Sequence, residues 1–147
     1  MSALDSLVEP EFAKDPPVKL NLDAKVVGIV LAILAGLGAL LGLLGLIGLF
    51  ALAAAFAGIF ALALIGVIVA VVADILAAVG GWRMYKGNPE GKRLAIYGLG
   101  LALVAELISI IGYGLNAGAI LQIIVLLVFY YVVVVSRFSP EARVQTP

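Results

Sequence analysis

Two long apolar runs dominate the pattern of hydrophobic and polar positions along the chain. Between residues 26 and 81 the one charged residue is Asp74, and between residues 94 and 136 the one charged residue is Glu106. A single helix over the first run would be roughly 84 Å long, whereas the hydrocarbon core of a bilayer is about 30 Å thick. We therefore expect two membrane-spanning helices in the first run. Gly112 and Gly114 interrupt the second run, so we expect two more there.

Capping and turn signals indicate where these helices begin and end. Asp23 is placed to cap the first helix, and Asn116 to cap the fourth. Gly87-Asn88-Pro89 predicts a very tight turn, because glycine is favoured just past a helix end, asparagine caps the next helix and proline suits its first position.

The connection between the first two helices has no polar residue and carries no comparable signal. Gly48 and Gly58 are its expected turning points. The resulting transmembrane domain covers residues 25–137, with spans expected at about 25–48, 58–85, 89–112 and 117–137.

Polar segments flank this domain at residues 1–24 and 138–147. We expect the N-terminal segment to be a loosely ordered tail. The alternative is a short interfacial helix, since Leu4, Leu7, Val8 and Phe12 recur at roughly helical spacing. Its acidic start does not fit a secretory signal, so the first span is expected to be a retained anchor.

Charge gives the orientation. With four spans, all nine basic residues fall on one side of the membrane: Lys14, Lys19, Lys25, Arg83, Lys86, Lys92, Arg93, Arg137 and Arg143. The positive-inside rule makes that side cytoplasmic. The sequence thus predicts an all-α, multi-pass integral membrane protein, an antiparallel bundle of four transmembrane helices with both termini in the cytoplasm. The expected location is a prokaryotic cytoplasmic membrane.

Composition excludes several classes of function. The chain is 65% hydrophobic and 12% charged, has no net charge, and contains neither cysteine nor histidine. We therefore expect no nucleic-acid partner, no metal and no cofactor. Enzymatic activity is not expected either, because the polar segments are too short to hold an active site and no phosphate-binding glycine loop occurs.

Small residues recur at helical spacing on the first three spans, which predicts close packing of helix backbones. The packing positions are Gly28 and Gly42 on the first span, Gly66, Ala70, Ala73, Ala77 and Gly80 on the second, and Gly98, Ala102, Ala105 and Gly112 on the third. The alternative is that part of the glycine surface of the first helix faces a second copy or another protein. The fourth helix has few small residues and is expected at the periphery, with Val133 tolerant of substitution.

The two intramembrane acids are the candidate site. Asp74 follows Gly66 by eight residues, and Glu106 follows Gly98 by eight, so each acid lies on the same flank of its small-residue stripe. Their depths differ by roughly 7 Å, which long side chains can bridge. The chain has no intramembrane lysine or arginine to pair with them; the candidate polar partners are Ser109, Tyr113, Asn116 and Gln122, or a cation.

Three interpretations of the acids remain open. The favoured one makes them protonated hydrogen-bond donors between helices; the others are proton or cation handling and contact with a partner's polar group. For the whole chain we expect a non-catalytic packing or accessory subunit of a larger membrane assembly or homo-oligomer. Its partners would be the lipid bilayer and other membrane subunits or copies of itself. The alternative is a small proton- or cation-handling transporter or channel that uses Asp74 and Glu106.

Overall fold

The computed structural model describes residues 2–56 and 61–138. In these ranges the regular elements are all helices: α1 (Ala3–Val8), the 3-10 helix η1 (Glu11–Ala13), α2 (Ala24–Ala55), α3 (Ala61–Tyr85), α4 (Pro89–Tyr113) and α5 (Ala117–Val135). The four long helices, α2 to α5, are each long and apolar enough to cross a membrane. The predicted all-helical class, with four helices able to span a membrane, is confirmed.

The predicted caps and the tight turn are present. Asp23 Oδ1 accepts from the Lys25 N–H at 2.8 Å, and Asn88 Oδ1 accepts from the Glu90 N–H at 2.9 Å. Gly87 adopts φ 81°, the left-handed conformation that glycine tolerates at a helix end. These local signals therefore determine how α2 and α4 begin.

The first helix is longer than predicted. It passes through Gly48 and continues to Ala55, so the prediction of a turn at Gly48 is wrong. Residues 49–55 are leucine, phenylalanine and alanine, which contain no helix-breaking signal and include strong helix formers. The second expected turning point, Gly58, lies outside the described residues. At the other end of the domain, α5 stops at Val135, two residues before the predicted boundary.

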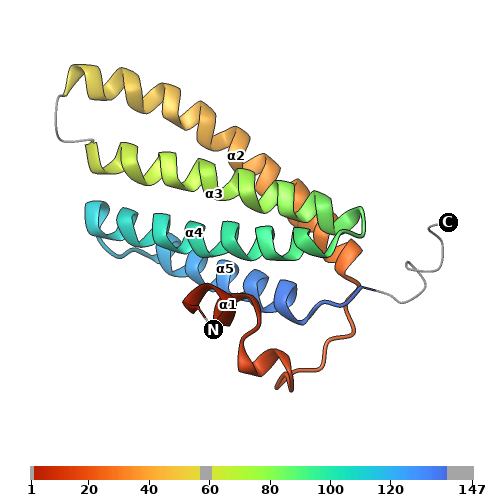
Figure 1. Cartoon of the computed structure of the whole chain (residues 1–147). Coiled ribbons are helices and arrows are strands. Elements are labelled where there is room, and N and C mark those ends of the chain that lie inside the picture. The colour runs from red at the N-terminus through yellow and green to blue at the C-terminus, as the bar shows by residue number, and fades with distance from the viewer. Residues whose placement is uncertain (1, 57–60, 139–147) are drawn as a thin grey trace.

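The four long helices lie in the order α2, α3, α4, α5 across the molecule, as Figure 1 shows. Helix α3 packs against both α2 and α4, and α5 packs against α4. Small residues make the central contacts: a Cβ on Gly98 would stand 2.5 Å from Ala77 N, and a Cβ on Gly28 would stand 2.6 Å from Gly81 O. Neighbouring backbones approach this closely only because side chains are missing at these positions.

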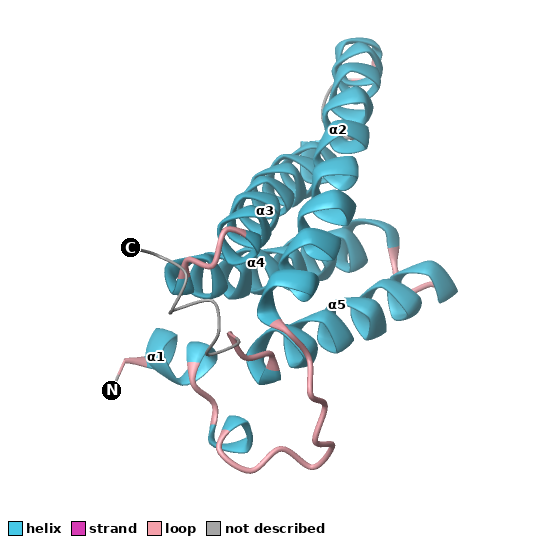
Figure 2. Ribbon diagram, turned by 90° about the vertical axis from the view of Figure 1, so that its right-hand side faces the viewer, coloured by secondary structure: helices cyan, strands magenta, loops and turns pink. Residues whose placement is uncertain are grey.

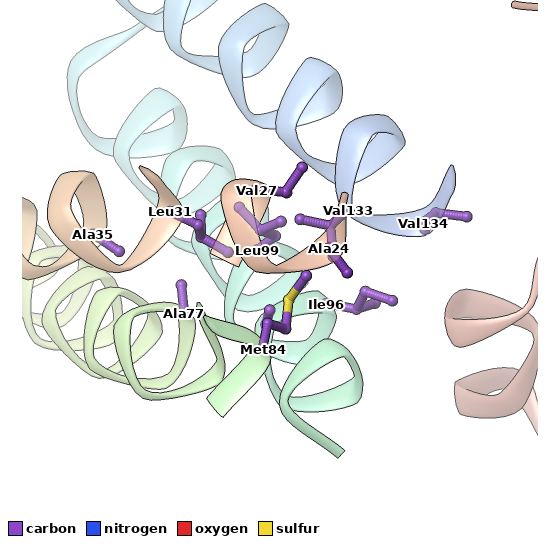
Figure 3. Packing of buried hydrophobic residues seen from close by; sticks show 11 residues of the cluster. Ala24, Val27, Leu31, Ala35, Ala77, Met84, Ile96, Leu99, Val133 and Val134 are labelled. Carbon is purple, nitrogen blue, oxygen red and sulfur yellow. The ribbon is translucent and has the colours of Figure 1, made fainter. Parts of the chain in front are cut away.

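All four helices meet at one end, called here the closed end. The Ala24 N–H donates to Arg137 O at 2.9 Å, the Arg137 N–H donates to Leu22 O at 3.0 Å, and the Gly87 turn lies beside Lys25. A cluster of buried apolar side chains fills the space between the helices there (Figure 3): Ala24, Val27, Leu31, Ala35, Ala77, Met84, Ala95, Ile96, Leu99, Val133 and Val134.

The prediction that α5 lies at the periphery is wrong for its C-terminal part, where Val133 is buried. Its side chain is 0% exposed, because the C-terminal part of α5 packs into this cluster. The N-terminal part of the same helix is largely exposed, at Leu121 for example. The expectation that Val133 tolerates substitution therefore does not hold.

Helices α2 and α5 diverge from each other with distance from the closed end, as Figure 2 shows; the opposite end is called here the open end. On α2 the close contacts with α3 reach Gly42, whose Cβ would stand 2.6 Å from Val71 Cγ2. At Gly45 and Gly48 no atom of residues 2–56 and 61–138 lies within 4 Å of such a Cβ. The last turns of α2 are thus bare on their glycine surface.

The N-terminal segment packs against the long helices instead of forming a loose tail. Tyr130 Oη donates to Leu7 O at 2.7 Å, and Tyr131 Oη donates to Val18 O at 2.9 Å. The Phe12 ring stacks on Tyr131 with centroids 5.8 Å apart. Residues 7–18 are therefore held along α5 near the closed end. The location of α1 at a membrane surface stays a prediction.

Candidate functional site

The closely packed interface between α3 and α4, called here the seam, positions both intramembrane acids. Ala73 is fully buried and Ala105 nearly so, because both face this seam. Asp74 and Glu106 are their immediate chain neighbours, so helix geometry turns each acid about 100° from the seam. The stripes of small residues thereby set where the two carboxyl groups lie.

Both acids line one cavity of about 240 Å³ between α3, α4 and α5, called here the acidic cavity. Its lining residues are Gly66, Val67, Ala70, Asp74, Ala102, Ala105, Glu106, Ser109, Gln122 and Leu126. On every helix these residues lie further from the closed end than the members of the buried cluster do. The acidic cavity therefore belongs to the part of the molecule where α2 and α5 have separated.

Two of the four candidate polar partners belong to this cavity, namely Ser109 and Gln122. The other two do not. Tyr113 is 61% exposed at the last residue of α4. Asn116 is occupied as the cap of α5, where its Oδ1 accepts from the Ala119 N–H at 3.0 Å. The polar side-chain groups that line the cavity are thus two carboxyls, one hydroxyl and one amide.

The carboxyl groups have no partner among residues 2–56 and 61–138. Glu106 is 9% exposed and Asp74 is half-buried, yet neither makes a hydrogen bond or an ion pair with a described residue. No polar side-chain atom in this part of the chain is sealed away without a partner, so the Glu106 oxygens open toward free space. The favoured interpretation, structural hydrogen-bond donors between helices of this chain, lacks the contacts it requires.

One further residue lies close to the Asp74 carboxyl, and no sequence pattern predicted it. A Cβ on Gly38 of α2 would stand 2.7 Å from Asp74 Oδ2. The Asp74 side chain therefore reaches toward the α2 backbone as well as lining the acidic cavity. Gly38 is one of several glycines in α2, and nothing in the sequence distinguishes it from Gly36. A Cβ added at Gly36 would meet no atom of the described residues within 4 Å.

The predicted packing residues divide into seam and cavity positions. Gly28, Gly80 and Gly98 contact backbone of the neighbouring helix, while Gly42 and Gly112 contact the side chains of Val71 and Leu62. Ala77 is buried in the cluster. Ala70 and Ala102 are half-buried and line the acidic cavity with Gly66, whose Cβ would stand 3.3 Å from Ser109 Oγ. Gly81 and Gly91, which the sequence analysis did not select, also contact backbone closely.

Comparisons with protein-family models, curated proteins and solved structures return no match to this chain.

The lining residues limit the chemistry of the acidic cavity. Two carboxyls, a hydroxyl and an amide can hold a proton, a small cation or a hydrogen-bond donor from another molecule. A volume of about 240 Å³ accommodates several waters or one side chain. In the described ranges no group of three or more histidine, cysteine, aspartate or glutamate residues could hold a metal ion.

Proposed function

We propose that this chain is a non-catalytic accessory subunit of a membrane protein assembly. In this proposal the four long helices cross the bilayer as an antiparallel bundle, with both termini in the cytoplasm. The observation that carries it is the acidic cavity, which holds two carboxyls without partners among the described residues. This cavity lies in the part of the molecule where α2 and α5 have separated.

The position of the basic side chains supports this orientation. Lys92 Nζ donates to Val134 O and Ser136 O, Arg93 pairs with Asp5, and Lys86 lies over the Trp82 ring, all near the Gly87 turn. An aromatic and basic girdle of this kind is typical of the cytoplasmic membrane interface. The closed end is therefore the cytoplasmic end in this proposal; the prokaryotic origin stays a prediction from sequence.

The cost of exposing acids to lipid supports association. A carboxylate in hydrocarbon costs several kcal/mol when it is ionised and unpaired. In a lone chain the space between α2 and α5, beside Asp74 and Glu106, would be filled by lipid tails, which offer no hydrogen bond. A neighbouring subunit in that space would cover the acids and also the bare glycine surface of α2.

A second candidate function is proton or cation handling by the same two acids. It is favoured by one observation: Asp74 and Glu106 share the cavity with Ser109 and Gln122, and the cavity has room for water. Ionisable residues that face a wet cavity inside a membrane are typical of ion and proton pathways.

Extraction of the protein from its native membrane in a mild detergent tests the first proposal. We expect the extracted protein to be part of a defined assembly with fixed stoichiometry. The double variant Asp74→Asn/Glu106→Gln should stay folded but dissociate from that assembly. Glu90→Gln, which changes an exposed acid in the first turn of α4, is the matched control and should leave the assembly intact.

Flux measurements distinguish the second candidate function, proton or cation handling, from the first. Purified protein in vesicles that contain a pH-sensitive dye should show no proton or cation flux above empty vesicles if it is an accessory subunit. A monomer that conducts, and that loses conduction in the double variant, would replace the first proposal with the second. A monomer without flux would contradict both.

A further inference from the structure

We propose that the acidic cavity receives a basic side chain from a transmembrane helix of a different protein, seated between α2 and α5. This inference rests on the proposed function and names the partner's chemistry. Two observations carry it: α2 and α5 diverge (Figure 2), and the acidic cavity holds two acids that have no partner among the described residues.

The two helices that flank the seat expose apolar side chains, as packing of a membrane helix requires. Beyond Gly42 the large side chains of α2 are exposed, at Leu44 and Ile47 for example. On the first half of α5 the same holds for Leu121 and Ile124. These flanks suit packing of another apolar helix, and the acids beside them add the polar contact that gives such packing specificity.

Glu106 is the group that points to a ligand. Its side chain is 9% exposed, lines the cavity and has no hydrogen-bond or ion-pair partner in the described ranges. Asp74 lines the same cavity, and its carboxyl also lies close to Gly38. A group placed between the two acids would be bound from both α3 and α4.

Charge complementarity identifies that group as a cation on a different protein. This chain has no basic residue between residues 26 and 82 or between 94 and 136. Lys92, at the cytoplasmic end of α4, is already bound to the carbonyls of Val134 and Ser136. A second copy seated in the same place has no basic residue at that depth, so self-association does not supply the cation.

A lysine ammonium matches the number of acceptors. It presents three N–H donors, and the cavity offers the Asp74 carboxyl, the Glu106 carboxyl and the side-chain oxygen of Ser109 or Gln122. With one ammonium for two acids, the second carboxyl binds in its protonated form. An arginine side chain satisfies the same acceptors through its fork of N–H groups.

The test uses the full chain in phosphatidylcholine vesicles with synthetic transmembrane peptides. Each peptide is a leucine-alanine helix that spans the bilayer, with lysine, leucine or glutamate at its centre and an energy-transfer acceptor at one end. Trp82, the one tryptophan in the chain, is the donor. We expect the lysine peptide to bind at least about tenfold more tightly than the leucine peptide, and the glutamate peptide to bind no better than leucine.

Variants then locate the contact. Asp74→Asn/Glu106→Gln should remove the lysine preference, and the matched control Glu90→Gln should keep it. Circular dichroism and thermal unfolding report whether the double variant is folded. The comparison of the three peptides on the unchanged protein decides the proposal even if the double variant does not fold.

Two results would overturn the inference. Equal binding of the lysine and leucine peptides by the unchanged protein means that no basic group is recognised. A lysine preference that persists in a folded double variant places the contact elsewhere. Native extraction distinguishes the two proposals: a defined assembly without lysine preference leaves the accessory function standing, and a native monomer with lysine preference removes it.

Discussion

The carboxyl group of Asp74 lies against the backbone of Gly38. A methyl group on Gly38 would come 2.7 Å from Asp74 Oδ2 and 3.1 Å from Asp74 Cγ. Helix α2 thus approaches α3 closely enough at this point that a hydrogen and a carboxyl group fill the space between them. The glycine on one helix and the acid on the other form one packing unit at the side of the acidic cavity.

A double-mutant cycle measures this unit. Gly38→Ala should destabilise the protein when Asp74 is present and have little effect in the Asp74→Ala background, where the space is vacant. We expect a coupling energy of about 1 kcal/mol, measured by equilibrium unfolding in mixed detergent micelles. Gly36→Ala is the control, because no atom lies within 4 Å of its Cβ position. Equal effects of Gly38→Ala in both backgrounds would contradict the contact.

The α3–α4 seam gives a matched pair of glycines on one helix. A Cβ at Gly98 would stand 2.5 Å from Ala77 N and 2.8 Å from Ala73 O, whereas at Gly100 nothing lies within 4 Å. Gly98→Ala should therefore cost about 1–3 kcal/mol of unfolding free energy through overpacking. Gly100→Ala should be neutral or stabilise by up to about 1 kcal/mol, because alanine is the better helix former. Similar unfolding curves for the two variants would rule out the close seam.

The two halves of α5 should respond differently to the same substitution. Val133 is 0% exposed in the closed-end cluster, and Val125 is exposed on the same helix. Lipid is as apolar as the cluster, so the loss at Val133→Ala comes from missing packing contacts rather than from water. We expect it to cost about 1–2 kcal/mol in the same unfolding assay, against a few tenths at Val125→Ala. A larger effect at Val125 would mean that α5 is packed by its other face.

The sequence was sufficient wherever a local signal sets the structure. Asp23, Asn88 and Asn116 cap the helices that they were expected to cap, because capping needs a side chain and a backbone N–H within three residues. The equal spacing of Asp74 from Gly66 and of Glu106 from Gly98 anticipated the shared cavity, because both acids flank stripes that pack against each other.

The missed features depend on how whole helices converge. Nothing in the apolar residues 49–55 stops a helix, so the extension of α2 to Ala55 had no signal. The burial of Val133 follows from the meeting of α2 and α5 at one end, and the role of Gly38 follows from the approach of α2 to α3. A period of 3.6 residues gives the face of one helix, but it does not give the neighbour at each depth.

The capping of α1 should depend on pH at the acidic extreme. The Ser2 backbone N–H and, to a lesser extent, the Ser2 hydroxyl hydrogen-bond to the Asp5 carboxyl, and Arg93 attracts it; together they hold its pKa below the usual 3.8. A lowered pKa in the folded state means that the contribution is complete above the usual value and is lost as the pH falls through the lowered one. Backbone amide NMR signals of residues 2–8 should report this loss.

The Asp5→Asn variant provides the control for this titration. The amide cannot titrate, so the pH-dependent change in residues 2–8 should disappear, and the contact between α1 and Arg93 should weaken at every pH. The ion pair is exposed to solvent, so high salt should weaken it in the unchanged protein as well. A step of the same size in Asp5→Asn would assign the titration to another group.

Single cysteines test the four-span topology, and the chain contains no cysteine that would interfere. A membrane-impermeant maleimide should label Ser2→Cys and Glu90→Cys from the cytoplasmic side and Leu115→Cys from the opposite side. Glu90 is chosen instead of Asn88 because the Asn88 side chain caps α4 through the Glu90 N–H. The decisive pair is Glu90 and Leu115, which lie near the two ends of the 25-residue helix α4. A helix of that length spans about 37 Å, more than the hydrocarbon core, so reaction of both from one side would mean that α4 does not cross the bilayer.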